Sequence, residues 1–219
     1  MAAVLDYSVY LILDPQQVGG RDPIGVAEAA VEGGVRLVQL RCKGGGREYL
    51  ELAKKLRRRL ERGGVPLIVN DRADVALASR AAGVHVGQDD LPAEAARALL
   101  GSEAAVGLSI TSTAEARSAP CDVIDYAGVG PVFETPSKPD AAPAMGLDAL
   151  AESCRLLRVP AVAIGGITLG RVTDVIRAGA SGVAVISAIC SATDPGRAAA
   201  ELVEAVASAR RLLAGSAAG

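Results

Sequence analysis

Short apolar runs alternate with amphipathic segments along almost the whole chain. The apolar runs are rich in valine, isoleucine and leucine, and they are mostly continuous instead of alternating with polar residues. Continuous runs of this kind are typical of parallel strands that are buried on both faces. The pattern predicts eight strands, near residues 7–13, 36–41, 66–70, 83–87, 104–110, 123–129, 160–164 and 182–187.

The amphipathic segments fill the intervals between these strands. They predict helices near residues 23–33, 47–62, 72–81, 92–100, 113–118, 147–157, 169–178 and 195–213. Eight strand–helix units close most simply into a single-domain (β/α)8 (TIM) barrel, which we expect over residues 1–214. An open doubly wound sheet is the alternative, because one sequence does not exclude a topological switch point. Residues 215–219 are expected to form a disordered tail.

Composition narrows the class of protein. Of the 219 residues 50% are hydrophobic, but no apolar run reaches the roughly 18–20 residues of a membrane span. The formal net charge of −2 and the 2% of aromatic residues argue against nucleic acid or an anionic membrane as a partner. The four cysteines form no C-x-x-C pair, and the N-terminus lacks a signal-peptide pattern. We therefore expect a cytoplasmic protein with reduced thiols.

A basic run lies on the predicted helix 47–62. Leu50, Leu56 and Leu60 share one face of this helix, and lysines and arginines of the segment 54–59 cover much of the rest. The run resembles a nucleic-acid patch, but acidic residues flank it. A solvated outer helix face is the favoured interpretation.

Carboxylates stand where the third and fourth strands end. Asn70-Asp71 follows one strand and Asp89-Asp90 the other, and these strands are neighbours in a barrel. Mg²⁺ takes one or two protein carboxylates and completes its shell with water and phosphate. The alternative is that Asp71 and Asp90 cap the helices that follow. Together with the basic cluster after the second strand, the pattern favours a Mg²⁺ site at Asp71 and Asp90.

That basic cluster is Gln39-Leu40-Arg41-Cys42-Lys43. Gln39, Arg41 and Lys43 alternate, so they share a face of an extended chain. Arginine offers a planar fork and lysine a mobile point charge, a combination that suits a diphosphate. Surface salt bridges are the alternative interpretation.

Glycines and a hydroxyl follow the seventh and eighth strands, at Gly165-Gly166 and Ile186-Ser187. In (β/α)8 enzymes the loops at these positions frequently bind phosphate through backbone N–H groups. The pattern indicates a phosphate-bearing ligand but no particular reaction, because isomerases, aldolases and synthases share it.

One loop, Pro131–Gly146, is long for a compact barrel and contains four prolines. Loops of this length are frequently active-site lids, and Gly130 and Gly146 are candidate hinges. Thr135, Ser137 and Lys138 either clamp phosphate oxygens there or form a hydrophilic turn.

Ser109, at the end of the fifth strand, faces the same rim as the other strand-end residues. His85 is the only histidine and lies within an apolar strand, so we interpret it as structural and not as a catalytic base. With one histidine so placed, no Ser/His/Asp or Cys/His arrangement is predicted. The cysteines offer no zinc spacing.

The order and spacing of these motifs resemble the thiamine phosphate synthase family, from about Tyr10 to Leu213. The matching motifs are Gln39-x-Arg41-x-Lys43, Asn70-Asp71, His85-x-Gly87-Gln88-x-Asp90, Gly107-x-Ser109, Gly128-x-Gly130-Pro131-x-Phe133, Thr135-x-Ser137-Lys138, Gly165-Gly166-Ile167 and Ile186-Ser187-Ala188-Ile189. The resemblance implies a (β/α)8 transferase that joins hydroxymethylpyrimidine diphosphate to a (carboxy)thiazole phosphate, giving thiamine phosphate and diphosphate. It implies Mg²⁺ as cofactor and a dissociative mechanism, in which diphosphate leaves before the thiazole nitrogen attacks.

Site residues carry over by position from this resemblance. Asp71 and Asp90 correspond to the Mg²⁺ ligands. The pyrimidine-diphosphate contacts correspond to Gln39, Arg41, Lys43, Asn70 and Lys138, and Ser109 faces the diphosphate and the reaction centre. Arg41, Lys43, Ser109 and Lys138 are the expected catalytic residues. Thr135 and Ser137 face the thiazole, and its phosphate is expected at Gly166, Ile186 and Ser187.

The chain departs from the family pattern at four places. Cys42 stands where the family usually has Glu, Ser137 where it has Thr, and Glu134 where Pro is frequent. Ile110-Thr111 replaces a frequent His-Thr or His-Asn. These departures bear on substrate affinity and loop geometry and leave the metal and phosphate positions intact.

Two rival functions share the barrel and its phosphate site. A thiazole tautomerase relies on a histidine where this chain has Ile110, and a non-catalytic phosphate-ligand sensor would lack Asp71, Asp90 or Arg41. Because neither condition holds, we expect the synthase, with the two small-molecule substrates as partners. The sequence leaves open whether the chain forms a homo-oligomer.

Overall fold

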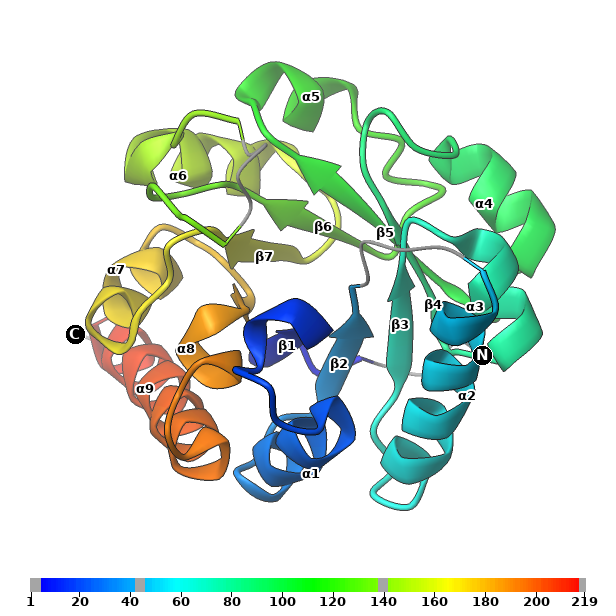
Figure 1. The fold of residues 1–219 in the computed structure, drawn as a ribbon. Coiled ribbons are helices and arrows are strands. Elements are labelled where there is room, and N and C mark those ends of the chain that lie inside the picture. The colour runs from blue at the N-terminus through cyan, green and yellow to red at the C-terminus, as the bar shows by residue number, and fades with distance from the viewer. Residues whose placement is uncertain (1–4, 42–45, 138–141, 217–219) are drawn as a thin grey trace.

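Eight parallel strands pair in sequence order, and β1 pairs with β8 to close the ring. The computed structural model describes residues 5–41, 46–137 and 142–216. The strands are β1 (Val9–Leu13), β2 (Leu37–Leu40), β3 (Leu67–Asn70), β4 (Gly83–Val86), β5 (Ala105–Ile110), β6 (Tyr126–Val129), β7 (Ala161–Ile164) and β8 (Gly182–Val185). Helices surround them as an outer ring (Figure 1). The predicted (β/α)8 barrel is confirmed, and the open doubly wound sheet is wrong.

The helices alternate with the strands in the predicted order. They are α1 (Pro23–Glu32), α2 (Arg47–Glu61), α3 (Ala73–Ser79), α4 (Ala93–Leu100), α5 (Thr113–Ser118), α6 (Gly146–Leu156), α7 (Val172–Arg177), α8 (Ser187–Cys190) and α9 (Pro195–Ser216). Two 3₁₀ turns, η1 (Pro15–Gln17) and η2 (Leu169–Arg171), precede α1 and α7. Capping side chains determine where some of these helices begin. The Asp22 side chain accepts hydrogen bonds from the N–H groups of Ile24 and Gly25, and Pro23 occupies the first helical position.

Most element ends shift by one to three residues from the predicted ranges, and two differences concern the start of α8 and the C-terminus. Ser187 begins the short helix α8 and does not end the eighth strand. Helix α9 continues to Ser216, so Gly215 and Ser216 are helical where a tail was expected, and residues 217–219 lie outside the described residues.

The barrel has two apolar layers, which explains why its strands read as continuous apolar runs. One set of strand side chains packs outward against the helices, together with residues such as Leu56 and Val206. The other set fills the barrel interior and includes Tyr10, Leu37, Ile68, Tyr126 and Val162. Because both faces are buried, successive residues of one strand are apolar. All five residues of β1 are buried for this reason.

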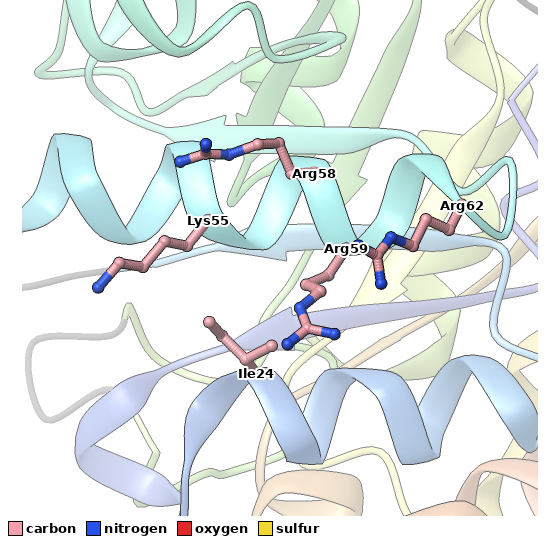
Figure 2. Close-up of a pocket in the computed structure, with 5 residues that line it drawn as sticks. All are labelled: Ile24, Lys55, Arg58, Arg59 and Arg62. Atoms are coloured by element: carbon pink, nitrogen blue, oxygen red, sulfur yellow. The ribbon is translucent and has the colours of Figure 1, made fainter.

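The basic run on α2 lines a hollow of about 330 Å³ against α1, on the outside of the barrel. Figure 2 shows its lining residues Ile24, Lys55, Arg58, Arg59 and Arg62. Neighbouring carboxylates offset part of this charge, since Arg59 lies 3.4 Å from Glu28 and Arg57 lies 2.8 Å from Glu61. These ion pairs are those of a solvated helix face, as the sequence suggested. Among the described residues, no helix is long and apolar enough to cross a membrane.

Two of the cysteines are held as unreactive thiols. Burial raises the pKa of the Cys154 and Cys190 thiols to about 11. Both therefore stay protonated at neutral pH, and the thiolate is the reactive form of cysteine. Cys121, Cys154 and Cys190 are free, and Cys42 lies outside the described residues.

Candidate active site

The predicted site residues that the structure describes all lie at or just beyond the carboxyl ends of the strands. A cavity of about 40 Å³ lies in the barrel interior at this end. Its lining residues are Tyr10, Ile12, Gln39, His85, Ser109, Tyr126, Gly128, Val162, Ile164 and Ala184. Gln39 and Ser109, which were predicted from their strand ends, both line this cavity. The carboxyl ends of barrel strands are the usual place of catalysis in this fold.

Arg41 is held by a carboxylate that the sequence analysis missed. Its Nη1 lies 2.6 Å from Oδ2 of Asp14, and the two side chains are only 12% and 2% exposed. Leu13 pairs with Leu40 across β1 and β2, so the residues that follow these strands meet at the rim. The other N–H groups of Arg41 have no hydrogen-bond partner in the described parts of the chain. Asp14 thus orients Arg41 and leaves donors available to a ligand.

Asp71 has an unusual backbone conformation at the end of β3. Its φ is +62°, a left-handed value that residues other than glycine seldom adopt. Its N–H donates to the carbonyl oxygen of His85 on β4 at 2.8 Å, which fixes the residue against the neighbouring strand. Backbone strain of this kind clusters at functional sites.

Asp90 lies in the turn that follows β4. Its Oδ2 accepts a hydrogen bond from the N–H of Gly87 at 2.7 Å, and the side chain is exposed. Neither Asp71 nor Asp90 caps the helix after it, because the N-caps of α3 and α4 are Arg72 and Pro92. The alternative capping interpretation is therefore wrong for both residues.

The strand ends next to the cavity are tied together by Tyr49 on α2. Its hydroxyl lies 2.9 Å from the carbonyl oxygen of Leu40 and 3.1 Å from that of Asn70, so its one proton is shared between two acceptors. One buried phenol thus fixes the end of β2, from which Arg41 continues, to the end of β3, where Asn70 precedes Asp71.

Polar side chains of five strands form a hydrogen-bonded line across the barrel interior. Gln39 Nε2 donates to the Tyr10 hydroxyl at 2.8 Å, and the Tyr10 and Tyr126 hydroxyls are 2.8 Å apart. The Tyr126 hydroxyl lies 3.1 Å from His85 Nδ1, and His85 Nε2 lies 3.0 Å from Ser109 Oγ. We call these five residues the barrel relay. It connects two predicted ligand contacts, Gln39 and Ser109, through three residues that the sequence did not assign to the site.

Gly107 makes room for the middle of the barrel relay. A Cβ atom at this position would lie 2.2 Å from Cζ of Tyr126 and 2.4 Å from Nδ1 of His85. Both distances are far below van der Waals contact. The glycine of the Gly107-x-Ser109 motif is thus required by the two ring side chains that meet beside it.

The expected phosphate site gathers residues that follow β7 and β8. The Ser137 and Ser187 hydroxyl oxygens lie 3.2 Å apart, which joins the long loop to the start of α8. In the part of the chain that the structure describes, the N–H groups of Gly166 and Ser187 make no hydrogen bond. Backbone N–H groups beside hydroxyls are the usual components of a phosphate site. Ile186 precedes Ser187 and is the N-cap of α8.

The described parts of the loop Pro131–Gly146 are anchored. The N–H groups of Val132 and Phe133 donate to the carbonyls of Ile164 and Gly165, and that of Gly146 donates to Val132. Gln17 Nε2 also donates to the Ser137 carbonyl at 2.9 Å. Both expected hinges make a backbone hydrogen bond, because the N–H of Gly146 donates to Val132 and the N–H of Gly130 donates to Ile110. The lid stays a prediction.

Thr135 lies beside Ser137 in this loop and accepts from its N–H at 3.3 Å. Two predicted contacts, Lys43 and Lys138, lie outside the described residues, as does Cys42. The structure thus brings together Gln39, Arg41, Asn70, Asp71, Asp90, Ser109, Thr135, Ser137, Gly166, Ile186 and Ser187 at one end of the barrel.

Comparison with known proteins agrees with this arrangement. A sequence profile described as thiamine monophosphate synthase matches residues 9–189. The chain belongs to the thiamine monophosphate synthase family. A thiamine-phosphate synthase of Syntrophomonas wolfei is 50% identical over 190 residues, which cover 86% of this chain and 91% of the relative. One of Xanthobacter autotrophicus is 46% identical over 96% of this chain and its own full length.

A solved structure supports the same conclusion. Thiamine phosphate pyrophosphorylase from Pyrococcus furiosus superposes with a TM-score of 0.84 and 34% identity, covering 93% of this chain and 97% of that one. The thiamine monophosphate synthase profile spans β1 to α8, so it contains every predicted site residue.

Proposed function

We propose that the barrel mouth joins hydroxymethylpyrimidine diphosphate to a (carboxy)thiazole phosphate, giving thiamine phosphate and diphosphate. The observation that supports this most directly is the gathering of Arg41, Asp71, Asp90 and Ser187 around one end of a barrel whose relatives are named thiamine-phosphate synthase. The site offers acidic, cationic and hydroxyl groups, as two phosphorylated substrates require.

The donor set suits Mg²⁺. Asp71 and Asp90 present two exposed carboxylates after neighbouring strands. Within the described residues, no group of three or more His, Cys, Asp or Glu side chains could hold a metal by themselves. Mg²⁺ is typically bound by one or two carboxylates and a substrate phosphate, unlike the closed ligand sets of structural zinc. Asp71 and Asp90 would hold this ion, which supplies neutralising charge to the diphosphate when bound.

The remaining residues act on the leaving group and the cation that it leaves behind. Arg41, oriented by Asp14, donates to the diphosphate as negative charge grows on it. Ser109 presents a hydroxyl at the cavity wall, where the bond to diphosphate breaks. The apolar wall, which includes Ile12 and Val162, excludes water from the pyrimidinylmethyl cation until the thiazole nitrogen attacks. No general base is needed in this sequence of steps.

The direct test is incubation of the chain with both substrates and Mg²⁺, followed by chromatographic detection of thiamine phosphate. Omitting either substrate or adding EDTA should abolish the product. Isomerisation of the thiazole phosphate without coupling would support the tautomerase instead, and binding without any turnover would support the sensor.

Ser187→Ala is expected to raise the KM for the thiazole phosphate by roughly 10-fold, because a hydrogen bond to a charged group is lost. The KM for the pyrimidine diphosphate should stay unchanged. Ser191→Ala, at the other end of α8, is the matched control, since the Ser191 hydroxyl donates to the Gln17 carbonyl. Equal changes in both KM values would contradict the assignment.

Gly166 is less suitable for this test. Its φ is +64°, and a Cβ atom there would lie 2.6 Å from the carbonyl oxygen of Glu134 and 2.8 Å from Cβ of Phe133. A larger side chain at Gly166 would displace the chain's own loop before it met a ligand.

Lys138→Ala is expected to lower kcat by more than it raises KM, because its ammonium is proposed to stabilise the leaving diphosphate as charge develops. The variant should also release more of the hydrolysed pyrimidine alcohol per thiamine phosphate formed. Both products are measured in one chromatogram. Arg117→Ala, an exposed cation on α5, is the control, and an unchanged kcat in Lys138→Ala would remove Lys138 from the site.

A further inference from the structure

The contacts of the barrel relay allow one continuous direction of hydrogen-bond donation, from Gln39 to Ser109. The side-chain nitrogen of Gln39 carries only donors, so the Tyr10 oxygen is the acceptor in their contact. The single Tyr10 proton is then available for the Tyr126 oxygen, 2.8 Å away. If Tyr10 donates there, the Tyr126 proton is available to Nδ1 of His85, which lies 3.1 Å away.

This direction selects one tautomer of His85. If Nδ1 accepts a hydrogen bond, the proton of the neutral imidazole resides on Nε2. Nε2–H then donates to the Ser109 oxygen at 3.0 Å. In this tautomer Ser109 keeps its own hydroxyl proton for another acceptor, and its side chain lines the cavity.

Burial keeps the two phenols in the state that this arrangement needs. Tyr10 is 2% exposed and Tyr126 is fully buried. Desolvation raises the pKa of both hydroxyls well above the ordinary value for tyrosine. Neither phenol ionises near neutral pH, so each remains both a donor and an acceptor.

At the other end of the barrel relay, the contact with Tyr10 fixes the orientation of the Gln39 side-chain amide. The amide nitrogen of Gln39 is engaged by Tyr10, and its amide oxygen makes no hydrogen bond within the described residues. Gln39 is 2% exposed and lines the same cavity as Ser109. With this direction of donation, and among the described residues, the cavity has a free acceptor at the β2 end and a free donor at the β5 end.

We propose that Tyr10, Tyr126 and His85 are positioning residues that orient Gln39 and Ser109 for the bound pyrimidine diphosphate. Gln39 presents its oxygen to a donor group of the heterocycle, and Ser109 presents its proton to an oxygen of the departing diphosphate. His85 acts only through Ser109 and takes no proton from the substrate. This inference rests on the proposed function for the identity of the ligand, but the direction of the relay does not.

The first experiment measures that direction without any substrate. Because His85 is the only histidine, the ¹⁵N-histidine spectrum of a tag-free protein contains the signals of one imidazole. A ¹H–¹⁵N correlation spectrum at one pH, with the ring neutral, distinguishes the two tautomers. We expect the proton on Nε2, with Nδ1 as the unprotonated nitrogen. A proton on Nδ1 would overturn the proposal, since Ser109 would then have to donate to His85.

The second experiment breaks the barrel relay at its centre. Tyr126→Phe removes the donor to His85, so we expect a mixture of tautomers and a kcat lowered by roughly 3- to 10-fold, the loss of about one neutral hydrogen bond. The KM for the thiazole phosphate should not change. Tyr7→Phe is the matched control: its ring centroid lies 5.0 Å from that of Tyr126, but its hydroxyl is outside the relay.

The kinetic and spectroscopic outcomes separate the possible failures. A wild-type kcat in Tyr126→Phe, or an equal loss in Tyr7→Phe, would overturn the positioning role. If Tyr126→Phe does not fold, the wild-type tautomer still decides the direction, and Tyr10→Phe tests the relay one residue upstream. If wild-type protein shows the Nε2–H tautomer but forms no thiamine phosphate, the proposed function fails and the relay geometry stands.

Discussion

Asp71→Asn and Asp90→Asn are each expected to lower kcat by on the order of 100-fold or more at millimolar Mg²⁺, because a shared metal ion loses a charged ligand. Asparagine retains an oxygen, so at position 90 it still accepts from the N–H of Gly87. Both native side chains are exposed, and the melting temperature should change little. The measurements are kcat as a function of Mg²⁺ concentration and thermal unfolding by circular dichroism.

Asp89→Asn is the matched control for this pair. Asp89 is an exposed neighbour, and its side chain makes no hydrogen bond or ion pair within the described ranges. The Asp89→Asn substitution removes the same charge from the same rim, so a general electrostatic effect on kcat would appear in this variant too. Full activity of Asp90→Asn at low Mg²⁺ would show that the site lies elsewhere.

Asp14→Ala is expected to lower the free energy of unfolding by about 3–5 kcal/mol, because it leaves a largely buried Arg41 guanidinium without its partner. The N–H of Gln16 loses an acceptor as well, since it donates to Asp14 Oδ1 at 2.9 Å. Denaturant unfolding gives the free energy. Turnover should also fall, because Arg41 loses the contact that orients it toward the diphosphate.

An exposed Arg–Asp ion pair of similar length provides the control for Asp14. Arg72 Nη2 lies 2.5 Å from Asp74 Oδ2, but these side chains are 42% and 63% exposed. Solvent screens such pairs, so Asp74→Ala should cost only about 0–1 kcal/mol. Equal losses in the two variants would mean that burial does not set the cost of breaking the Asp14–Arg41 pair.

The sequence predicted the strands well because each is buried on both faces. A strand such as β3 presents side chains to the helices and to the barrel interior, and its apolar run is therefore unbroken. The start of α8 was not predicted, because this helix is only one turn long and follows β8 almost directly. Nothing in Ile186-Ser187 separates the end of a strand from the start of such a turn.

The sequence predicted only those site residues that directly follow an apolar strand. Asp71 and Asp90 are polar residues directly after apolar runs, and parallel strands bring such residues to one rim. Asp14 has the same signal at the end of β1 but was passed over, although the pairing of β1 with β2 places it beside Arg41.

The middle of the barrel relay was not predictable in this way. Tyr10 and Tyr126 read as core residues, and they are indeed buried. His85 was interpreted as structural, and it does lie in a buried strand, but its ring is bonded to Ser109. Which buried polar groups meet depends on strand register and on the space left by Gly107, and neither is visible in one sequence.

The closure of the ring links the earliest and the latest parts of the chain. β1 pairs with β8, and α9 packs against both α1 and α7 across that junction. Arg210 on α9 donates to the Ser8 hydroxyl at 2.8 Å and to the Ser181 carbonyl. During synthesis, the edge of β1 that faces away from β2 has no partner until β8 has emerged from the ribosome. Contacts this distant in sequence also form slowly. The nascent chain therefore carries an open sheet edge for most of its translation, a period in which chaperone binding offers the most protection.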